Sequence, residues 1–127
     1  GDSDGAGHVL GGIIDGAQDV DWFVYQGNDG ICVVNPSGEL SVDLPGARLC
    51  VFIECLQGDT EFGPCQAGAS EDTSPDGLAG CCSTSSLDLD GFNCTGTTSE
   101  DLWVYMRVDQ PGGPAGVCNS YTVTYHY

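Results

Sequence analysis

The chain contains no lysine and only two arginines, Arg48 and Arg107, against 19 acidic residues, which gives a formal net charge of −17. Proteins that bind nucleic acid neutralise phosphates with lysine and arginine, and docking on an anionic membrane surface needs the same side chains. We therefore expect no nucleic-acid partner and no attachment to anionic lipid. Such acidity is typical of a strongly hydrated surface or of one that attracts cations.

Long apolar runs and helical periodicity are also absent from the sequence. No stretch approaches the roughly 18 consecutive apolar residues of a transmembrane helix, so we expect no membrane insertion. Residues 1–7, GDSDGAG, are typical of a flexible linker or an N-terminal extension. Because residue 1 is glycine, we expect that a leader or an upstream segment has been removed. Residues 8–127 have the length of one domain.

The signatures of catalysis and of zinc binding are missing as well. No serine lies in a G-x-S-x-G motif, and the two histidines, His8 and His126, lie at opposite ends of the chain. Cys81 and Cys82 are adjacent, but no C-x-x-C pair of the kind that zinc sites use is present. We therefore expect a protein that is neither an enzyme nor a zinc protein.

The chain does contain eight cysteines in 127 residues. An even count in a small acidic domain indicates four disulfides and an oxidising, extracellular or cell-surface location. Cys81 and Cys82 should take different partners, because a bridge between neighbours is strained. Cys50 and Cys55 would face opposite sides of one strand, so we expect them not to pair with each other. The connectivity is otherwise open among Cys32, Cys50, Cys55, Cys65, Cys81, Cys82, Cys94 and Cys118.

Short segments of alternating apolar and polar residues, separated by turn sequences such as Asn28-Asp29-Gly30, predict β-strands. Residues 57–100 are rich in Gly, Ser, Thr, Pro and Asp, and we expect a surface excursion pinned by disulfides, with short strands such as residues 86–89. The pattern predicts an all-β fold, an antiparallel two-sheet β-sandwich. The other predicted strands are residues 9–14, 21–26, 31–35, 40–44, 47–56, 102–108 and 121–127.

The strand at residues 21–26 is apolar on both faces. We assign Trp22 and Val24 to its buried face, and Phe23 and Tyr25 to its outer face. The buried face would be shared with a second strand through Leu102, Val104, Met106 and Val108. The aromatic residues either fill the core or form a platform for carbohydrate or protein. The candidates for that platform are Trp22, Trp103, Tyr105, Tyr121, Tyr125 and Tyr127.

Several of these segments resemble a known family. Gly11-Gly12-Ile13-Ile14, followed by the DVDWFVY sequence of residues 19–25, resembles the opening of bacterial pre-peptidase C-terminal (PPC) domains. Residues 105–108 and 121–125 resemble the last two strands of that family. The cysteine-rich form is similar to uncharacterised surface proteins of myxobacteria. The resemblance implies a secreted bacterial jelly roll that binds a substrate or a matrix; it does not cover residues 57–100, and most members have few cysteines.

Acidic residues crowd the first 21 positions of the chain. Carboxylates on irregular backbone are the ligands that calcium prefers, so Ca²⁺ is the cofactor that this region suggests. In calcium-binding relatives the linker and the turn before the Asp-Trp strand supply the ligands. By that resemblance the metal positions are Asp2, Asp4, Asp19 and Asp21. The alternative is that these acidic residues only line turns.

Two functions stay open. The first is a non-catalytic extracellular or cell-surface module for binding or adhesion, whose partner is a protein or a polysaccharide. The second is a structural subunit of an extracellular fibre, in which copies of the chain assemble by strand exchange and residues 9–14 complete a neighbour's sheet. Self-repulsion among the acidic residues also predicts raised carboxyl pKa values and a stability that rises with salt.

Overall fold

The computed structural model describes residues 8–27, 37–41, 46–89, 92–96 and 101–126. Within these ranges all regular structure is β-strand, and no helix there has the length and apolar character needed to cross a membrane. The all-β prediction is therefore confirmed. The strands are β1 (His8–Asp15), β2 (Val20–Gly27), β3 (Ser37–Ser41), β4 (Arg48–Cys55), β5 (Asp59–Phe62), β6 (Ser70–Thr73), β7 (Ala79–Ser83), β8 (Ser86–Asp88), β9 (Phe92–Thr95), β10 (Leu102–Asp109) and β11 (Cys118–His126).

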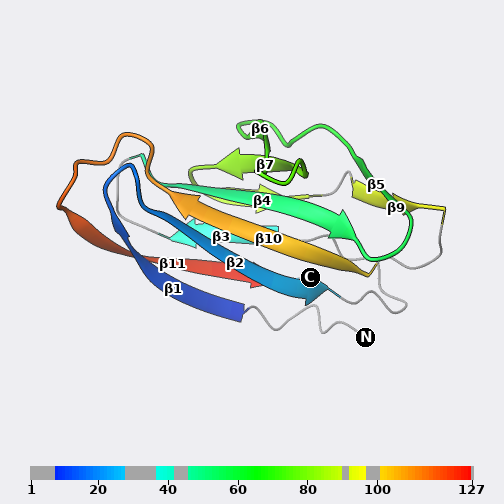
Figure 1. The fold of residues 1–127 in the computed structure, drawn as a ribbon, viewed down its shortest axis with the longest axis horizontal. Coiled ribbons are helices and arrows are strands. Elements are labelled where there is room, and N and C mark those ends of the chain that lie inside the picture. Colours follow the sequence, from blue (N-terminus) through cyan, green and yellow to red (C-terminus); the bar gives the residue numbers. More distant parts are fainter. Residues whose placement is uncertain (1–7, 28–36, 42–45, 90–91, 97–100, 127) are drawn as a thin grey trace.

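The strands form two packed antiparallel sheets and one small ribbon. One sheet has the order β1-β11-β3-β8, the other has the order β2-β10-β4-β7-β6, and β5 pairs with β9. Figure 1 shows the sheet of β1 and β11 lying against the sheet of β2, β10 and β4. β1 and β2 are consecutive in the chain, yet they are the end strands of opposite sheets. The short turn between them therefore closes one side of the sandwich.

The core lies between the two sheets and is built by strict alternation along the central strands. In β10 the side chains of residues 102, 104, 106 and 108 are buried, while those of residues 103, 105 and 107 face outward and are half-buried. β4, which pairs with β10 along its whole length, supplies Leu49, Val51 and Ile53 to the same core. The predicted inward face of residues 102–108 is confirmed.

The prediction for the faces of β2 is wrong. Trp22 is 42% exposed and Val24 is 55% exposed, whereas Phe23 and Tyr25 pack against the core. Phe23 meets the Tyr121 ring edge-on with 6.5 Å between centroids. The reason is Asp21, which shares a face with Phe23 and must point inward to accept a hydrogen bond from the Tyr121 hydroxyl. Apolar character alone did not distinguish the two faces.

Disulfides pin the segment that follows β4, as predicted. Cys50 pairs with Cys82, Cys55 with Cys94, and Cys65 with Cys81. The adjacent Cys81 and Cys82 thus take different partners, and Cys50 does not pair with Cys55, so both exclusions are confirmed. Residues 57–100 contain the short strands β5 to β9, which confirms the expected mixture of strands and excursion.

Three of the four predicted bridges lie among the described residues, where Cys118 is an exposed free thiol at the start of β11. The structure does not test the fourth bridge, because that bridge would need Cys32. Cys32, the predicted strand at residues 31–35 and the turn at residues 28–30 lie outside the described residues. Residues 40 and 41 belong to β3, and residues 42–45 lie outside the description.

Candidate functional site

The outer face of the five-stranded sheet carries an unusual set of aromatic and charged side chains. On β10, Tyr105 lies opposite Val24 of β2 on one side and Phe52 of β4 on the other. Arg107 lies opposite Trp22 and Cys50 in the next row of the same face. Because residues two apart on a strand share a face, these side chains form two adjacent rows across β2, β10 and β4.

The tip of the β6–β7 hairpin covers part of this face. Residues 74–78 form a tight turn in which the Leu78 amide donates to Ser74 Oγ at 3.0 Å and the Gly77 amide donates to the Ser74 carbonyl at 2.9 Å. Gly77 has a φ of 89°, a left-handed conformation that glycine adopts without strain. The tip therefore holds Pro75 and Asp76 at a fixed place beside the sheet.

Beneath the tip lies a second small core. Cys50, Phe52 and Cys82 are buried, and Leu78 and Tyr105 pack against them. Phe52 is fully buried although it faces away from the main core. Its ring lies over Gly80, where a Cβ would overlap the ring and the Val51 carbonyl. The tip and the sheet are thus packed together as one rigid support.

A groove runs between the tip and the edge strand β2. It has a volume of about 380 Å³, which lies within the usual range of ligand sites. Two of its wall residues, Trp22 and Val24, are among the exposed large hydrophobic residues of the molecule. Other wall residues are Pro75, Asp76, Leu78 and Tyr105. An exposed apolar surface with a polar rim is typical of an interaction site.

A second hollow of about 380 Å³ is lined mainly by residues of β6 and β7. Its walls come from Gly63, Glu71, Asp72, Thr73, Ala79 and Gly80. No aromatic side chain lines it, and Asp72 is already paired with Arg107. The groove beside Trp22 therefore offers the stronger candidate for binding.

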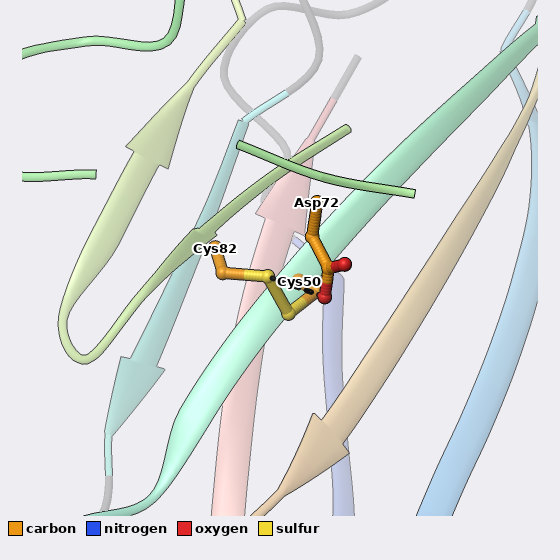
Figure 2. A group of neighbouring side chains, drawn as sticks. All are labelled: Cys50, Asp72 and Cys82. Atoms are coloured by element: carbon orange, nitrogen blue, oxygen red, sulfur yellow. Dashed lines mark hydrogen bonds between the residues drawn. A yellow bond between two sulfur atoms is a disulfide. The ribbon is translucent and has the colours of Figure 1, made fainter. Parts of the chain in front are cut away.

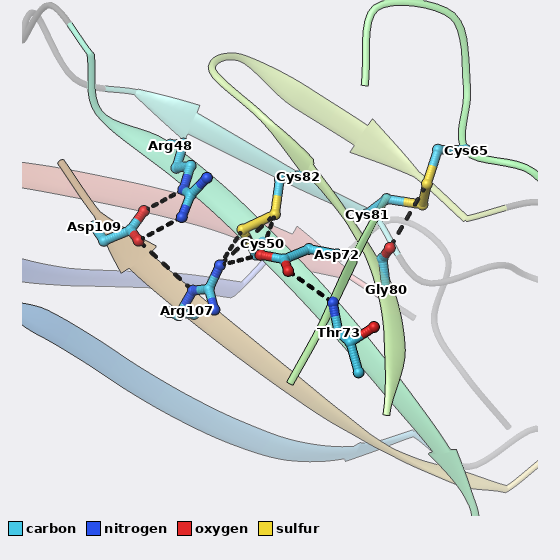
Figure 3. Close-up of a disulfide and its surroundings, with 10 residues drawn as sticks. All are labelled: Arg48, Cys50, Cys65, Asp72, Thr73, Gly80, Cys81, Cys82, Arg107 and Asp109. Atoms are coloured by element: carbon cyan, nitrogen blue, oxygen red, sulfur yellow. Dashed lines mark hydrogen bonds and ion pairs between the residues drawn. A yellow bond between two sulfur atoms is a disulfide. The ribbon is translucent and has the colours of Figure 1, made fainter. Parts of the chain in front are cut away.

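Both arginines of the chain are paired on this face (Figure 3). Arg48 binds Asp109 with two hydrogen bonds, at 2.7 and 3.0 Å. Arg107 donates to Asp72 at 2.6 Å and lies 3.7 Å from Asp109. Its guanidinium lies 5.6 Å from the Trp22 ring centroid and 5.3 Å from that of Phe52. Arg107 therefore makes a cation–π contact with Trp22.

These ion pairs shift two pKa values. The hydrogen bond from Arg107 lowers the pKa of Asp72, and the hydrogen bond to Asp109 raises the pKa of Arg48. The expectation that acidic residues have raised pKa values is wrong for Asp72, because a guanidinium contacts it directly.

Two carboxylates act on the groove wall at Tyr105. The pKa of Tyr105 is raised, first by loss of hydration and then by the charges of Glu54 and Asp76. A negative charge near a phenol opposes the phenolate and so raises its pKa. The apolar walls therefore lie in the field of at least two carboxylates.

Cys50, Cys82 and Asp72 form a group that resembles a metal site by proximity alone (Figure 2). The two sulfur atoms and a carboxylate oxygen lie within 4.8 Å of one another. However, the sulfur atoms are bonded to each other, and Arg107 occupies the carboxylate. Metal binding by cysteine requires free thiolates, so the oxidised protein has no thiolate ligand to offer there.

Two of the proposed calcium ligands fall within the described residues. Asp19 accepts a hydrogen bond from the Asp15 amide at 2.9 Å, and Asp21 accepts one from the Tyr121 hydroxyl at 2.6 Å. Asp2 and Asp4 lie outside the described residues. Calcium binding at these four positions stays a prediction.

The structure brings together only part of the predicted aromatic platform. Trp22 and Tyr105 share the groove, and Trp103 lies on the same outer face as Tyr105. Tyr121 is buried, Tyr125 packs against the main core, and Tyr127 lies outside the described residues. Sequence reasoning missed the hairpin tip, although Pro75-Asp76-Gly77 is a recognisable turn signal.

The chain was compared with protein-family models, with curated proteins and with solved structures, and none of the three comparisons gave a match. The site must therefore be interpreted from its own geometry.

Proposed function

We propose that this chain is a non-catalytic extracellular or cell-surface β-sandwich module that binds a macromolecular partner through the groove beside Trp22. The observation that carries the proposal is an exposed tryptophan whose ring packs against its neighbours on a sheet. Trp22 is 42% exposed, yet its ring contacts Phe52, with 5.8 Å between centroids, and the guanidinium of Arg107. A large aromatic side chain that is already ordered loses little entropy on binding.

Two further features support this function. Three disulfides indicate an oxidising environment. The resemblance of residues 11–14 and 19–25 to PPC domains agrees with a binding role outside the cell.

The alternative is a fibre subunit assembled by strand exchange, and one observation favours it. β1 is the end strand of its sheet, and it exposes Val9 (68%) and Ile13 (60%). A terminal edge strand of this kind can leave its own sheet and pair with a neighbour. Exchange would have to break the pairing of β1 with β11, which runs from His8 to Asp15.

Retention of the oxidised chain on insoluble polysaccharides and on immobilised matrix proteins tests the binding function. The informative pair of variants is Val24→Ser in the groove and Val9→Ser on β1, because both change an exposed valine on an edge strand. We expect at least one of these materials to retain the chain, and Val24→Ser to weaken that retention while Val9→Ser does not.

The opposite pattern would favour strand exchange. In that case Val9→Ser, and not Val24→Ser, would alter the behaviour of the chain. Size-exclusion chromatography would then show large assemblies of the wild-type chain that the Val9→Ser variant fails to form.

A further inference from the structure

We propose that the groove beside Trp22 receives a basic side chain, lysine or arginine, from a protein partner. The aliphatic stem of that side chain would lie against Trp22, Val24 and Tyr105, and its charge would pair with Asp76. This inference rests on the proposed binding function and names the chemistry of its partner.

Charge complementarity is the first argument. The chain carries 19 acidic residues and two arginines, and both arginines are paired with Asp72 and Asp109. Neither arginine is paired with Asp76 in the described part of the chain. A basic side chain would bring Asp76 a cation that neither arginine supplies in the described part of the chain, whereas an acidic side chain would add a second negative charge beside it.

The shape and polarity of the groove give the second argument. Trp22, Val24, Leu78 and Tyr105 supply apolar walls, and Asp76 supplies a carboxylate in the same lining. The side chains of lysine and arginine combine the same two features, because each has an apolar stem that ends in a charged group. A wholly apolar or a neutral ligand would bring no positive charge to pair with that carboxylate.

The position of Asp76 gives the third argument. It lies at the tip of the β6–β7 hairpin, between Pro75 and Gly77, and the Ser74–Leu78 hydrogen bonds hold that turn closed. Its charge acts on Tyr105 across the groove. The backbone that carries this carboxylate is therefore held beside the aromatic walls before any ligand binds, which favours recognition.

A set of matched peptides tests the inference. The probes are acetyl-Gly-X-Gly-amide peptides in which X is lysine, arginine, norleucine or glutamate. Norleucine has the apolar stem of lysine without its charge. Binding is followed in low salt by the NMR shifts of the Trp22 indole N–H. We expect the lysine and arginine peptides to bind roughly threefold to tenfold more tightly than the norleucine peptide, and the glutamate peptide to bind least.

Two variants test whether the carboxylate of Asp76 pairs with the basic side chain of the peptide. Asp76→Ser removes the carboxylate and keeps a turn-forming residue, and Asp59→Ser removes an exposed carboxylate from β5, outside the groove. We expect Asp76→Ser to remove the preference for lysine over norleucine and Asp59→Ser to preserve it. Equal binding of the lysine and norleucine peptides, or an unchanged preference in Asp76→Ser, would overturn the inference.

The same experiment tests the proposed binding function separately from the basic partner. If all peptides shift the Trp22 signal equally, or if only a polysaccharide does so, the groove still binds a ligand and only the basic partner is wrong. The Trp22 signal could also stay unchanged with every peptide and with every material that retains the chain. In that case both the binding function of the groove and the basic partner are wrong.

Discussion

The hydroxyl of Tyr121 donates a 2.6 Å hydrogen bond to the carboxylate of Asp21, although the two residues lie 100 positions apart. Tyr121 belongs to β11 in one sheet and Asp21 to β2 in the other. The bond therefore joins the sheets at the side where β1 passes into β2. Burial, reinforced by the bond to Asp21, raises the pKa of Tyr121, so the phenol remains protonated and can donate.

Tyr121→Phe should lower the free energy of unfolding by about 1–3 kcal/mol, because it removes a hydrogen bond to a carboxylate and leaves Asp21 without this donor. Urea denaturation measures the change. Tyr105→Phe is the matched control, since it removes a phenol hydroxyl from the half-buried outer face of β10, and we expect an effect within about 0.5 kcal/mol. Equal effects of the two substitutions would show that the Tyr121–Asp21 bond has no special role.

Gly12→Ala should destabilise the fold by about 1–3 kcal/mol through overpacking. The Tyr121 ring crosses directly over Gly12, and an added Cβ would overlap its hydroxyl and come within 2.9 Å of Asp21. Gly112→Ala is the control, because a Cβ at Gly112 meets nothing within 4 Å. Thermal unfolding compares the two variants, and an unchanged melting temperature for Gly12→Ala would contradict the described position of Tyr121.

The ion pair between Asp72 and Arg107 should give the stability a defined pH dependence. Because the pKa of Asp72 is lowered in the folded protein, the unfolded chain takes up the proton first as the pH falls. The stabilisation is therefore complete above about pH 5 and is lost as the pH falls below the ordinary aspartate value of about 3.9.

Comparison with Asp72→Asn isolates this contribution. The difference in unfolding free energy between wild type and Asp72→Asn should be constant above about pH 5 and shrink in more acidic solution. Asp59→Asn controls for the general loss of one negative charge. A difference that grows toward acid would reverse the assigned sign and refute the Asp72–Arg107 pairing.

Alkylation of the native chain without reductant should label Cys118, the exposed thiol, and leave six cysteines protected. Peptide mapping after digestion identifies the labelled position. A reduced and denatured sample, in which all eight cysteines react, is the control. Recovery of Cys118 in a disulfide-linked peptide would contradict the described state of that residue.

The sequence predicted the structure correctly where residues close together in the chain were enough to decide the outcome. The alternation of residues 102–108 predicted the buried face of β10 correctly, and the adjacency of Cys81 and Cys82 predicted that they have different partners. The face of β2 was not predictable in the same way, because Trp22 and Phe23 are both large and apolar. The choice depends on Asp21, whose partner Tyr121 is remote in the sequence.

Single residues of the candidate groove were predictable from the sequence, but their arrangement in space was not. Trp22 and Tyr105 were recognised as aromatic candidates, but the sequence does not show that β2 and β10 pair so that Tyr105 lies opposite Val24. It also does not show that the turn at residues 74–78 covers the outer face beside them. The pairing of Arg107 with Asp72 likewise joins β10 to β6, two strands that are not neighbours in the sheet.

We propose the groove beside Trp22 as the binding surface of this chain. Its most direct test is a map of amide and indole NMR shifts when a retained polysaccharide fragment or a basic peptide is added to the ¹⁵N-labelled chain. We expect the largest shifts to cluster at Trp22, Val24, Leu78 and Tyr105. Shifts confined to β1 and β11, with those four residues unmoved, would contradict it.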